Sequence, residues 1–339
     1  MAGFVQWMER RQIALYLAAI VLGGVVGWFA PAVAPGLALS INPVLGLLLF
    51  ATFLGVPMIQ AGRAFLDIRF LGIVLLVNFV VVPVVAFGLS RFVAGDRALL
   101  LGVLLVLLTP CVDYVIVFTG LAGGARDRLL AATPLLMLLQ IVLLPGYLLL
   151  FAGPATVSVI EIEPFLEAFL VLIVIPLLAA ATVQWVSRRH RFGRAIEAVI
   201  QALMVPLMMA TLAVVIGSQI AAVGTRIASL LLVVPLYIAF LVIMVVVGLS
   251  ASRLAHLDVP ATRALVFSGS TRNSLVVLPL ALALPASLSL AALAVVAQTL
   301  VELVGMVILV RLVPGLTGQG QAADKWAQPS PSGIPGSCQ

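Results

Sequence analysis

The chain has 339 residues, of which 64% are hydrophobic and only 9% charged, and its mean hydropathy is +1.30. Soluble domains carry about a quarter charged residues, and no aqueous fold could hide this much apolar surface. The composition therefore excludes a soluble enzyme. It also excludes a nucleic-acid-binding protein in spite of the net charge of +6, and it predicts an integral membrane protein whose main partner is the lipid bilayer.

Ten apolar runs are long enough to cross roughly 30 Å of hydrocarbon. In chain order they fall near 12–33, 39–60, 70–93, 99–122, 129–152, 164–186, 197–220, 227–250, 264–286 and 288–313. The first run follows a basic patch, as in a signal peptide, but it exceeds the length of a signal core and more runs follow. The sequence thus predicts an all-α membrane protein with ten transmembrane helices.

The basic residues predict how these helices are oriented. With a cytoplasmic N-terminus, fourteen of the 18 Lys and Arg residues fall on the cytoplasmic side. Only Arg91, Arg97 and Arg226 fall on the other side, and Arg272 lies within a span. This asymmetry follows the positive-inside rule. We therefore expect a multi-pass protein of the plasma membrane, of the bacterial inner-membrane type, with both termini in the cytoplasm.

The ten predicted helices divide into two halves of five. An odd number of helices per half means that the second half enters the membrane from the opposite side, which gives an inverted repeat. We expect the first repeat over 1–152 and the second over 153–314. The segment 315–339 is rich in Gly, Pro, Ser and Gln, which predicts a disordered cytoplasmic tail.

The fourth helix of each half carries polar residues in mid-membrane, as TPCVDY at 109–114 and SGSTRNS at 268–274. Proline lacks a backbone donor and glycine weakens a helix, so both segments predict broken helices lining a polar cavity. We expect the broken fourth and ninth helices to cross at the midplane and to form the transport site. The residues expected to support the breaks are Thr109, Pro110, Gly269, Ser270, Ser274 and, from the fifth helix, Gln140.

Asp113, Arg272 and Glu302 are the ionisable residues placed well inside predicted helices. Each costs at least about 2.5 kcal/mol at the bilayer centre, so it needs a partner or a watery cavity. Asp113 and Arg272 either form a structural salt bridge or bind substrate and ions, and the two roles are compatible. Glu302 is interpreted as a proton-carrying carboxylate in preference to a structural acid, and the repeat places it opposite Gln140.

Cys111 lies between Pro110 and Asp113 in the predicted break, where an accessible thiol could bind a thiophilic ligand. Most single cysteines in helices are small buried hydrophobes, and that interpretation stays open. Neither histidine has metal-ligand spacing, and the chain lacks a G-x-x-x-x-G-K-[ST] loop and an H-E-x-x-H motif. We therefore expect no enzyme activity, no metal site and no cofactor, only a coupling ion, H⁺ or Na⁺.

In these residues the chain resembles the arsenical-resistance efflux permeases, a branch of the bile acid/sodium symporter superfamily. The likeness is most specific at Pro110-Cys111 with VIVF at 115–118, and at the LVE triplet that ends at Glu302. The resemblance implies a ten-helix fold with crossed, broken fourth and ninth helices. It also implies that Cys111 coordinates arsenite and that Glu302 takes part in proton coupling, so that proton-coupled arsenite export is the function expected from the resemblance.

Other features of the sequence depart from the arsenite branch. Asp113 stands where a small or neutral residue is expected, and Arg272 is unusual in the ninth helix. The other branch of the superfamily resembles sodium-coupled carriers of organic anions. For such a carrier, Arg272 would pair with a carboxylate and Asp113 or Glu302 would help to bind sodium, while Asn273 is expected to contact substrate in either case. A receptor or scaffold would leave these polar residues unexplained.

Overall fold

The computed structural model describes residues 2–55, 67–112, 114–153, 167, 169–223 and 227–318. Every regular element within these ranges is a helix. The described residues form a single isolated β-bridge, between Pro110 and Arg272. The predicted all-α class is therefore confirmed for the described part of the chain.

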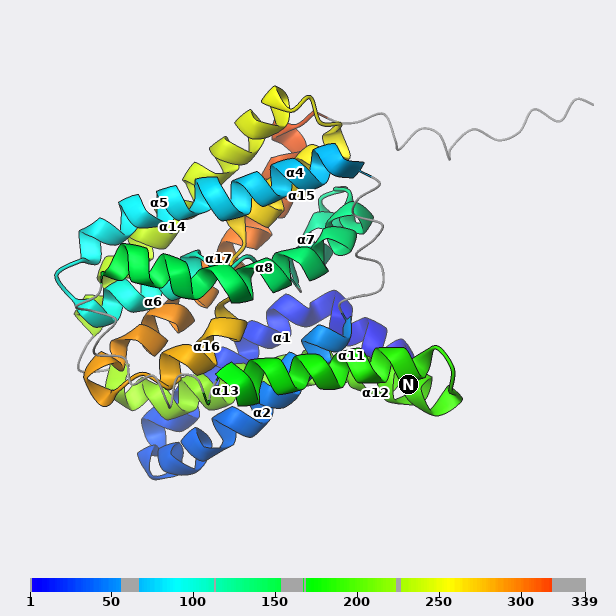
Figure 1. Ribbon diagram of the computed structural model, residues 1–339. Helices are drawn as coiled ribbons and strands as arrows, with labels where there is room; N and C mark the ends of the chain where they lie inside the picture. The colour runs from blue at the N-terminus through cyan, green and yellow to red at the C-terminus, as the bar shows by residue number, and fades with distance from the viewer. Residues whose placement is uncertain are drawn as a thin grey trace, which may run out of the picture.

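The helices form two bundles that are visible as the lower and upper parts of Figure 1. The small bundle contains α1 (Ala2–Phe29), η1 (Pro31–Val33), α2 (Ala34–Gly55), η6 (Leu170–Val174), α11 (Ile175–Ser187), α12 (Arg191–Ala202) and α13 (Met204–Val223). The crossing bundle contains α4 (Ile68–Leu76), η4 (Val77–Val81), α5 (Val82–Ser90), η5 (Arg91–Val93), α6 (Arg97–Leu107), α7 (Tyr114–Leu121), α8 (Arg126–Ala152), α14 (Ile227–Leu254), α15 (Val259–Ser270), α16 (Ser274–Leu282), η7 (Ala286–Leu288) and α17 (Leu290–Leu316). Each bundle therefore combines helices from both predicted halves of the sequence.

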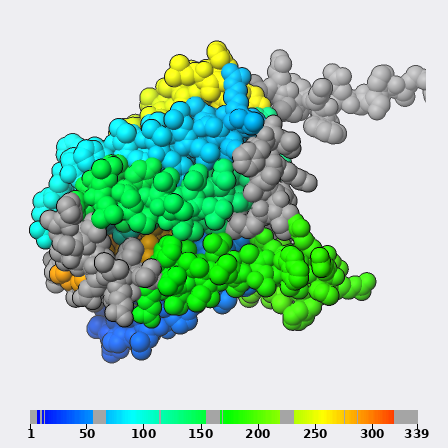
Figure 2. All heavy atoms as spheres, in the orientation of Figure 1, coloured from blue at the N-terminus to red at the C-terminus, as the bar shows by residue number. Residues whose placement is uncertain are grey.

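Most helices present apolar side chains outward. Val142 on α8 is 72% exposed, Leu178 on α11 is 61% exposed and Leu39 on α2 is 82% exposed. Helices that satisfy their own backbone hydrogen bonds and expose apolar side chains fit a hydrocarbon solvent. In the space-filling view, α8 of the crossing bundle lies on the face turned to the viewer, above α11 to α13 of the small bundle (Figure 2).

Six helical segments in the described residues are long and apolar enough to cross a membrane, and a seventh qualifies if α12 and α13, bent by 46°, form one span. Helices cover most of the described residues in all ten predicted runs, and the main interruptions are 108–112 in the fourth run and 271–273 in the ninth. The lower number arises partly because the fourth and ninth runs are each divided into two short helices, and neither half is long enough to cross the membrane alone. The full set of ten spans and its inverted symmetry stays a prediction.

A proline explains the irregular turn in the third predicted helix. Pro83 has no N–H to donate to Phe79, four residues earlier, and the preceding residues Val77–Val81 form a π-helical turn. The carbonyl of Phe79 accepts a hydrogen bond of 2.5 Å from the Tyr147 hydroxyl instead. This turn carries Asn78, which is completely buried.

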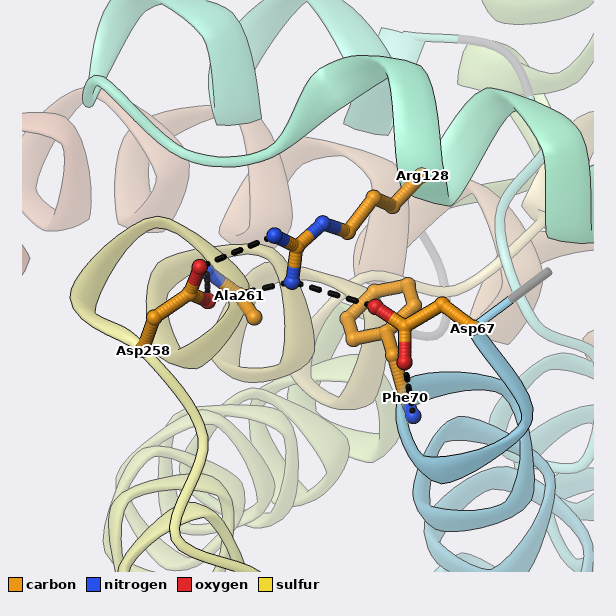
Figure 3. Close-up of polar contacts among 5 residues, drawn as sticks. All are labelled: Asp67, Phe70, Arg128, Asp258 and Ala261. Carbon is orange, nitrogen blue, oxygen red and sulfur yellow. Dashed lines mark hydrogen bonds and ion pairs between the residues drawn. The ribbon is translucent and has the colours of Figure 1, made fainter.

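An ion cluster joins three helix ends in the crossing bundle (Figure 3). Asp67 caps α4 through a bond from Phe70 N, and Asp258 caps α15 through a bond from Ala261 N. The Arg128 guanidinium lies 3.1 Å from Asp67 and 2.9 Å from Asp258. The three segments all belong to one predicted side of the membrane, so their proximity agrees with the predicted alternation of loops.

The C-terminal boundary differs slightly from the sequence prediction. Helix α17 continues to Leu316, beyond the predicted start of the tail at residue 315. Arg263 then donates to Thr317 Oγ1 and to the Gly318 carbonyl, both at 2.9 Å, which holds the end of the helix against α15. The predicted tail beyond residue 318, and the boundary between the halves near 153, fall largely outside the described residues.

Candidate functional site

Two broken helices build the centre of the crossing bundle. Helix α6 ends at Leu107 and α7 begins at Tyr114, with Pro110 between them, while α15 ends at Ser270 and α16 begins at Ser274. Asn273 caps α16, because its Oδ1 accepts a hydrogen bond of 3.2 Å from Val276 N. Both interruptions predicted from the sequence are therefore present.

The two breaks meet and satisfy each other's backbone groups. Asn273 N donates to Thr109 O at 2.8 Å, and Cys111 N donates to Thr271 O at 3.3 Å. Pro110 and Arg272 form the antiparallel bridge between these two bonds. Irregular backbone can persist inside a membrane protein only when its polar groups find such partners or line a polar cavity. We call this meeting point the crossing.

Arg272 fills the crossing with a fully buried positive charge. Its Nη2 donates to Asn78 Oδ1 at 2.8 Å, to Ser268 O at 2.7 Å and to Gly269 O at 2.9 Å, and its Nη1 donates to Leu107 O at 3.4 Å. The guanidinium carbon also lies 5.5 Å from the centre of the Phe240 ring, which adds a cation–π contact. The guanidinium therefore binds protein oxygens in this conformation.

Glu302 approaches the crossing from α17 and is also fully buried. Its Oε2 accepts a hydrogen bond of 2.7 Å from Arg272 N and a short one from Gln298 Nε2. The Arg272 N–H and the Thr271 carbonyl belong to the same peptide group, and that carbonyl accepts from Cys111 N. One peptide plane therefore lies between Cys111 on one side and the Glu302 carboxylate on the other.

Several polar atoms at the crossing have no hydrogen-bond partner among the described residues. Ser270 Oγ, Asn273 Nδ2 and Gln298 Oε1 are buried atoms of this kind. Ser274 Oγ, by contrast, accepts a bond of 2.8 Å from Thr299 on α17. Buried polar groups of this kind are costly unless water, an ion or a substrate satisfies them. They indicate a polar site between α15, α16 and α17.

The structure brings most of the predicted site residues together, with two exceptions, and it buries Cys111, whose thiol was expected to be accessible. Asp113 lies outside the described residues. Gln140 is buried in α8, but its amide makes no hydrogen bond to the described residues and takes no part in the contacts of the crossing. Gly269 and Ser270 end α15 and Ser274 begins α16, so all three flank the break at residues 271–273, and Gly269 contributes its carbonyl to Arg272.

Asn78 and Gln298 also contact residues of the crossing, although they are not among the site residues predicted from the sequence. Asn78 donates to Ser268 Oγ at 3.0 Å while it accepts from Arg272. Gln298 could have been found, because it lies four residues before Glu302 and so occupies the same face of the helix. Asn78 carried a weaker signal, since a single buried amide in an apolar run does not reveal its distant partner.

Two cavities lie where the small bundle faces the crossing bundle. One, of about 740 Å³, is lined by α1, α7, α12 and α13 and includes Tyr16, Gly120 and Ala202. The other, of about 250 Å³, lies near the start of η6 and the end of α16 and includes Asn42 and Ala283. Helices α7 and α16 are the second halves of the two broken helices, so each cavity borders one of them.

The described residues contain no group of three His, Cys, Asp or Glu side chains able to hold a metal ion. The comparison with curated proteins finds no match for the chain. The family model described as the sodium bile acid symporter family matches residues 42–226, more than half of the 339 residues. The chain therefore belongs to the sodium bile acid symporter family, and it is a multi-pass membrane protein of a transporter family.

Proposed function

We propose that the chain is a secondary active transporter that exports arsenite in exchange for protons, with substrate bound at the crossing. The observation that carries this proposal is the peptide group that joins Cys111 to Glu302. Arsenite is thiophilic, which suits a cysteine ligand, and a carboxylate can carry the exchanged proton. The resemblance to arsenical-resistance permeases at Cys111 and Glu302 supports the same roles.

The shared peptide group supplies a physical route for coupling. A hydrogen bond to an ionised carboxylate is roughly twice as strong as one to a neutral acceptor. When Glu302 gains a proton, its hold on Arg272 N weakens, and the peptide group can shift with respect to Cys111. Protonation would therefore act on the backbone of Cys111, whose side chain is the proposed substrate ligand. Asn273 and Ser270 would supply polar contacts to the oxygens of arsenite.

Alternating access would then expose the crossing to the two cavities in turn. Transporters of this type commonly rock one bundle against another around a fixed central site. The two bundles and the cavities between them provide the parts for such a motion. Under the predicted topology, substrate would enter from the cytoplasm and leave on the opposite side of the plasma membrane.

Arsenite retention in cells tests this function. In a bacterial strain that lacks its own arsenite efflux, the wild-type chain should lower intracellular arsenic several-fold and Cys111→Ser should abolish that effect. Cys338→Ser removes the other cysteine of the chain and is the matched control, which should behave as wild type. Full activity of a membrane-inserted Cys111→Ser variant would refute the role of the thiol.

The second candidate is sodium-coupled symport of a small organic anion, which family membership favours. In that case the Arg272 guanidinium would have to exchange some of its bonds to protein oxygens for bonds to the anion. A labelled bile acid is a suitable first probe. Sodium-dependent uptake that is lost in Arg272→Ala, together with no arsenite transport by inserted wild type, would establish this candidate instead.

A further inference from the structure

The oxygens around the Arg272 guanidinium resemble the ligand set of a sodium ion. They comprise the backbone carbonyls of Leu107, Ser268 and Gly269 and the side-chain oxygen of Asn78. All four are neutral. In secondary transporters, coupling sodium ions are coordinated by carbonyls of unwound backbone and of half-helix C-terminal ends. We call these four oxygens the oxygen cage.

The helix ends also select a cation at this position. Leu107 is the last residue of α6, and Ser268 and Gly269 lie in the last turn of α15. The C-terminal end of a helix carries a partial negative charge of about half an elementary charge. Two such ends therefore converge on the oxygen cage, and a positive charge placed there is stabilised by both.

The positive charge in the cage is covalently attached to the chain. Arg272 is fully buried, and its guanidinium donates to all four cage oxygens. An arginine guanidinium stays protonated under all physiological conditions, so this charge cannot leave as a sodium ion can. A sodium ion and the guanidinium cannot occupy the same oxygens together.

We propose that the Arg272 guanidinium is a resident cation that takes the place of a sodium ion at the crossing, so that this transporter does not use Na⁺ there. The inference rests on transport at the crossing, as proposed above, but not on the identity of the substrate. It gives a structural reason for proton coupling in a family whose description names sodium. It makes Asn78 a positioning residue that completes the cage.

Thermal stability of the purified, full-length protein tests this inference without any transport measurement. The Tm is compared in equimolar NaCl and N-methyl-D-glucamine chloride. Wild type should show the same Tm in both salts. Arg272→Ala leaves the cage oxygens in place and removes the cation, so its Tm should be lower and should rise by about 2 °C or more in NaCl. Low concentrations of methylguanidinium should raise the Tm of this variant but not of wild type.

Arg263→Ala is the matched control. Arg263 also donates to backbone carbonyls, of Ala122 and Gly318, but it is only partly buried, so water can replace it. This variant should respond to Na⁺ and methylguanidinium as wild type does. If Arg272→Ala does not accumulate, Arg272→Lys decides the question, because its ammonium group should fill the cage and leave the Tm independent of Na⁺.

Two results would overturn the inference. One is an Arg272→Ala protein whose response to Na⁺ equals that of wild type. The other is a Tm of Arg272→Lys that depends on Na⁺ more strongly than that of wild type. Both results report on cation binding at the oxygen cage and not on transport. Absence of arsenite transport by wild type would refute the proposed substrate but would not affect the inference about Arg272. The two failures are therefore distinguishable.

Discussion

Glu302 and Arg272 show why single residues at the crossing carry more than one role. The Arg272 side chain holds the ends of α6 and α15 together, while its backbone N–H bonds Glu302. Because the charge of the side chain is buried in neutral oxygens, its removal should affect stability first. The backbone contact belongs to the peptide group whose carbonyl accepts from Cys111 N, so a change in Glu302 should affect coupling first.

Glu302→Gln should separate coupling from folding. The amide keeps an oxygen that can accept from Arg272 N, but it cannot be protonated near neutral pH. We expect the variant to insert and to bind arsenite, and to lose at least about 90% of proton-driven transport, a tenfold loss of rate that equals about 1.4 kcal/mol of activation free energy. Transport by everted vesicles is the measurement, with Glu197→Gln as the control. Proton-driven transport at the wild-type rate would contradict the role of Glu302.

Asn78→Leu should destabilise the protein because it removes a cage oxygen and leaves Ser268 and Arg272 short of a partner. A buried polar group left without its partner costs about 1–3 kcal/mol, so the Tm should fall by several degrees. Asn42→Leu replaces an exposed asparagine and is the stability control. Equal Tm values for the two variants would show that the Asn78 contacts contribute little.

At the scale of elements, the crossing depends on how closely α6 and α17 approach. Gly102 on α6 faces Ala291 on α17, and a Cβ atom added to Gly102 would lie 2.6 Å from the Ala291 carbonyl oxygen. Small residues at helix contacts permit this kind of backbone approach in membrane proteins. Glu302 lies about three helix turns beyond Ala291 on α17. The close contact therefore positions α17 so that Glu302 reaches the break between α15 and α16.

Gly102→Ala should therefore force α6 and α17 apart. Gly72 on α4 has no atom within 4 Å of an added Cβ, so Gly72→Ala provides a control with the same chemical change. We expect a Tm several degrees lower for Gly102→Ala, because overpacking costs about 1–3 kcal/mol, and an unchanged or slightly higher Tm for Gly72→Ala. The reverse order of the two Tm values would refute the close contact.

The sequence predicted the breaks in the fourth and ninth helices because proline, glycine and charged residues interrupt otherwise apolar runs. It could not predict the partners of those residues. The bond between Arg272 and Asn78 joins positions 194 residues apart, and a long-range contact leaves no local pattern in one sequence. Gln140 was expected at the crossing by repeat symmetry, but the described contacts there do not include it. Side-chain contacts need not obey that symmetry.

At the scale of the whole molecule, the arrangement of two bundles separates the cavities. The larger cavity lies beside the end of α7, and the smaller lies beside the end of α16. The crossing connects these two half-helices through backbone hydrogen bonds. A movement of the crossing bundle against the small bundle would therefore widen one cavity while it narrows the other.

Cysteine accessibility tests this movement. In a Cys338→Ser background, Ala202→Cys reports on the larger cavity and Ala283→Cys on the smaller one. Arsenite added together with a proton gradient should shift the population between the two states of the transporter. The rate of maleimide labelling should then rise at one position and fall at the other, by at least about twofold. Parallel changes at both positions would be inconsistent with alternating access.

The most direct measurement of the central claim is arsenite flux through the purified protein in sodium-free proteoliposomes with an imposed proton gradient. We predict uptake driven by the gradient in wild type, its loss in Cys111→Ser and its retention in Cys338→Ser. No gradient-driven arsenite flux through correctly inserted wild type, or an equal flux through Cys111→Ser, would contradict the account.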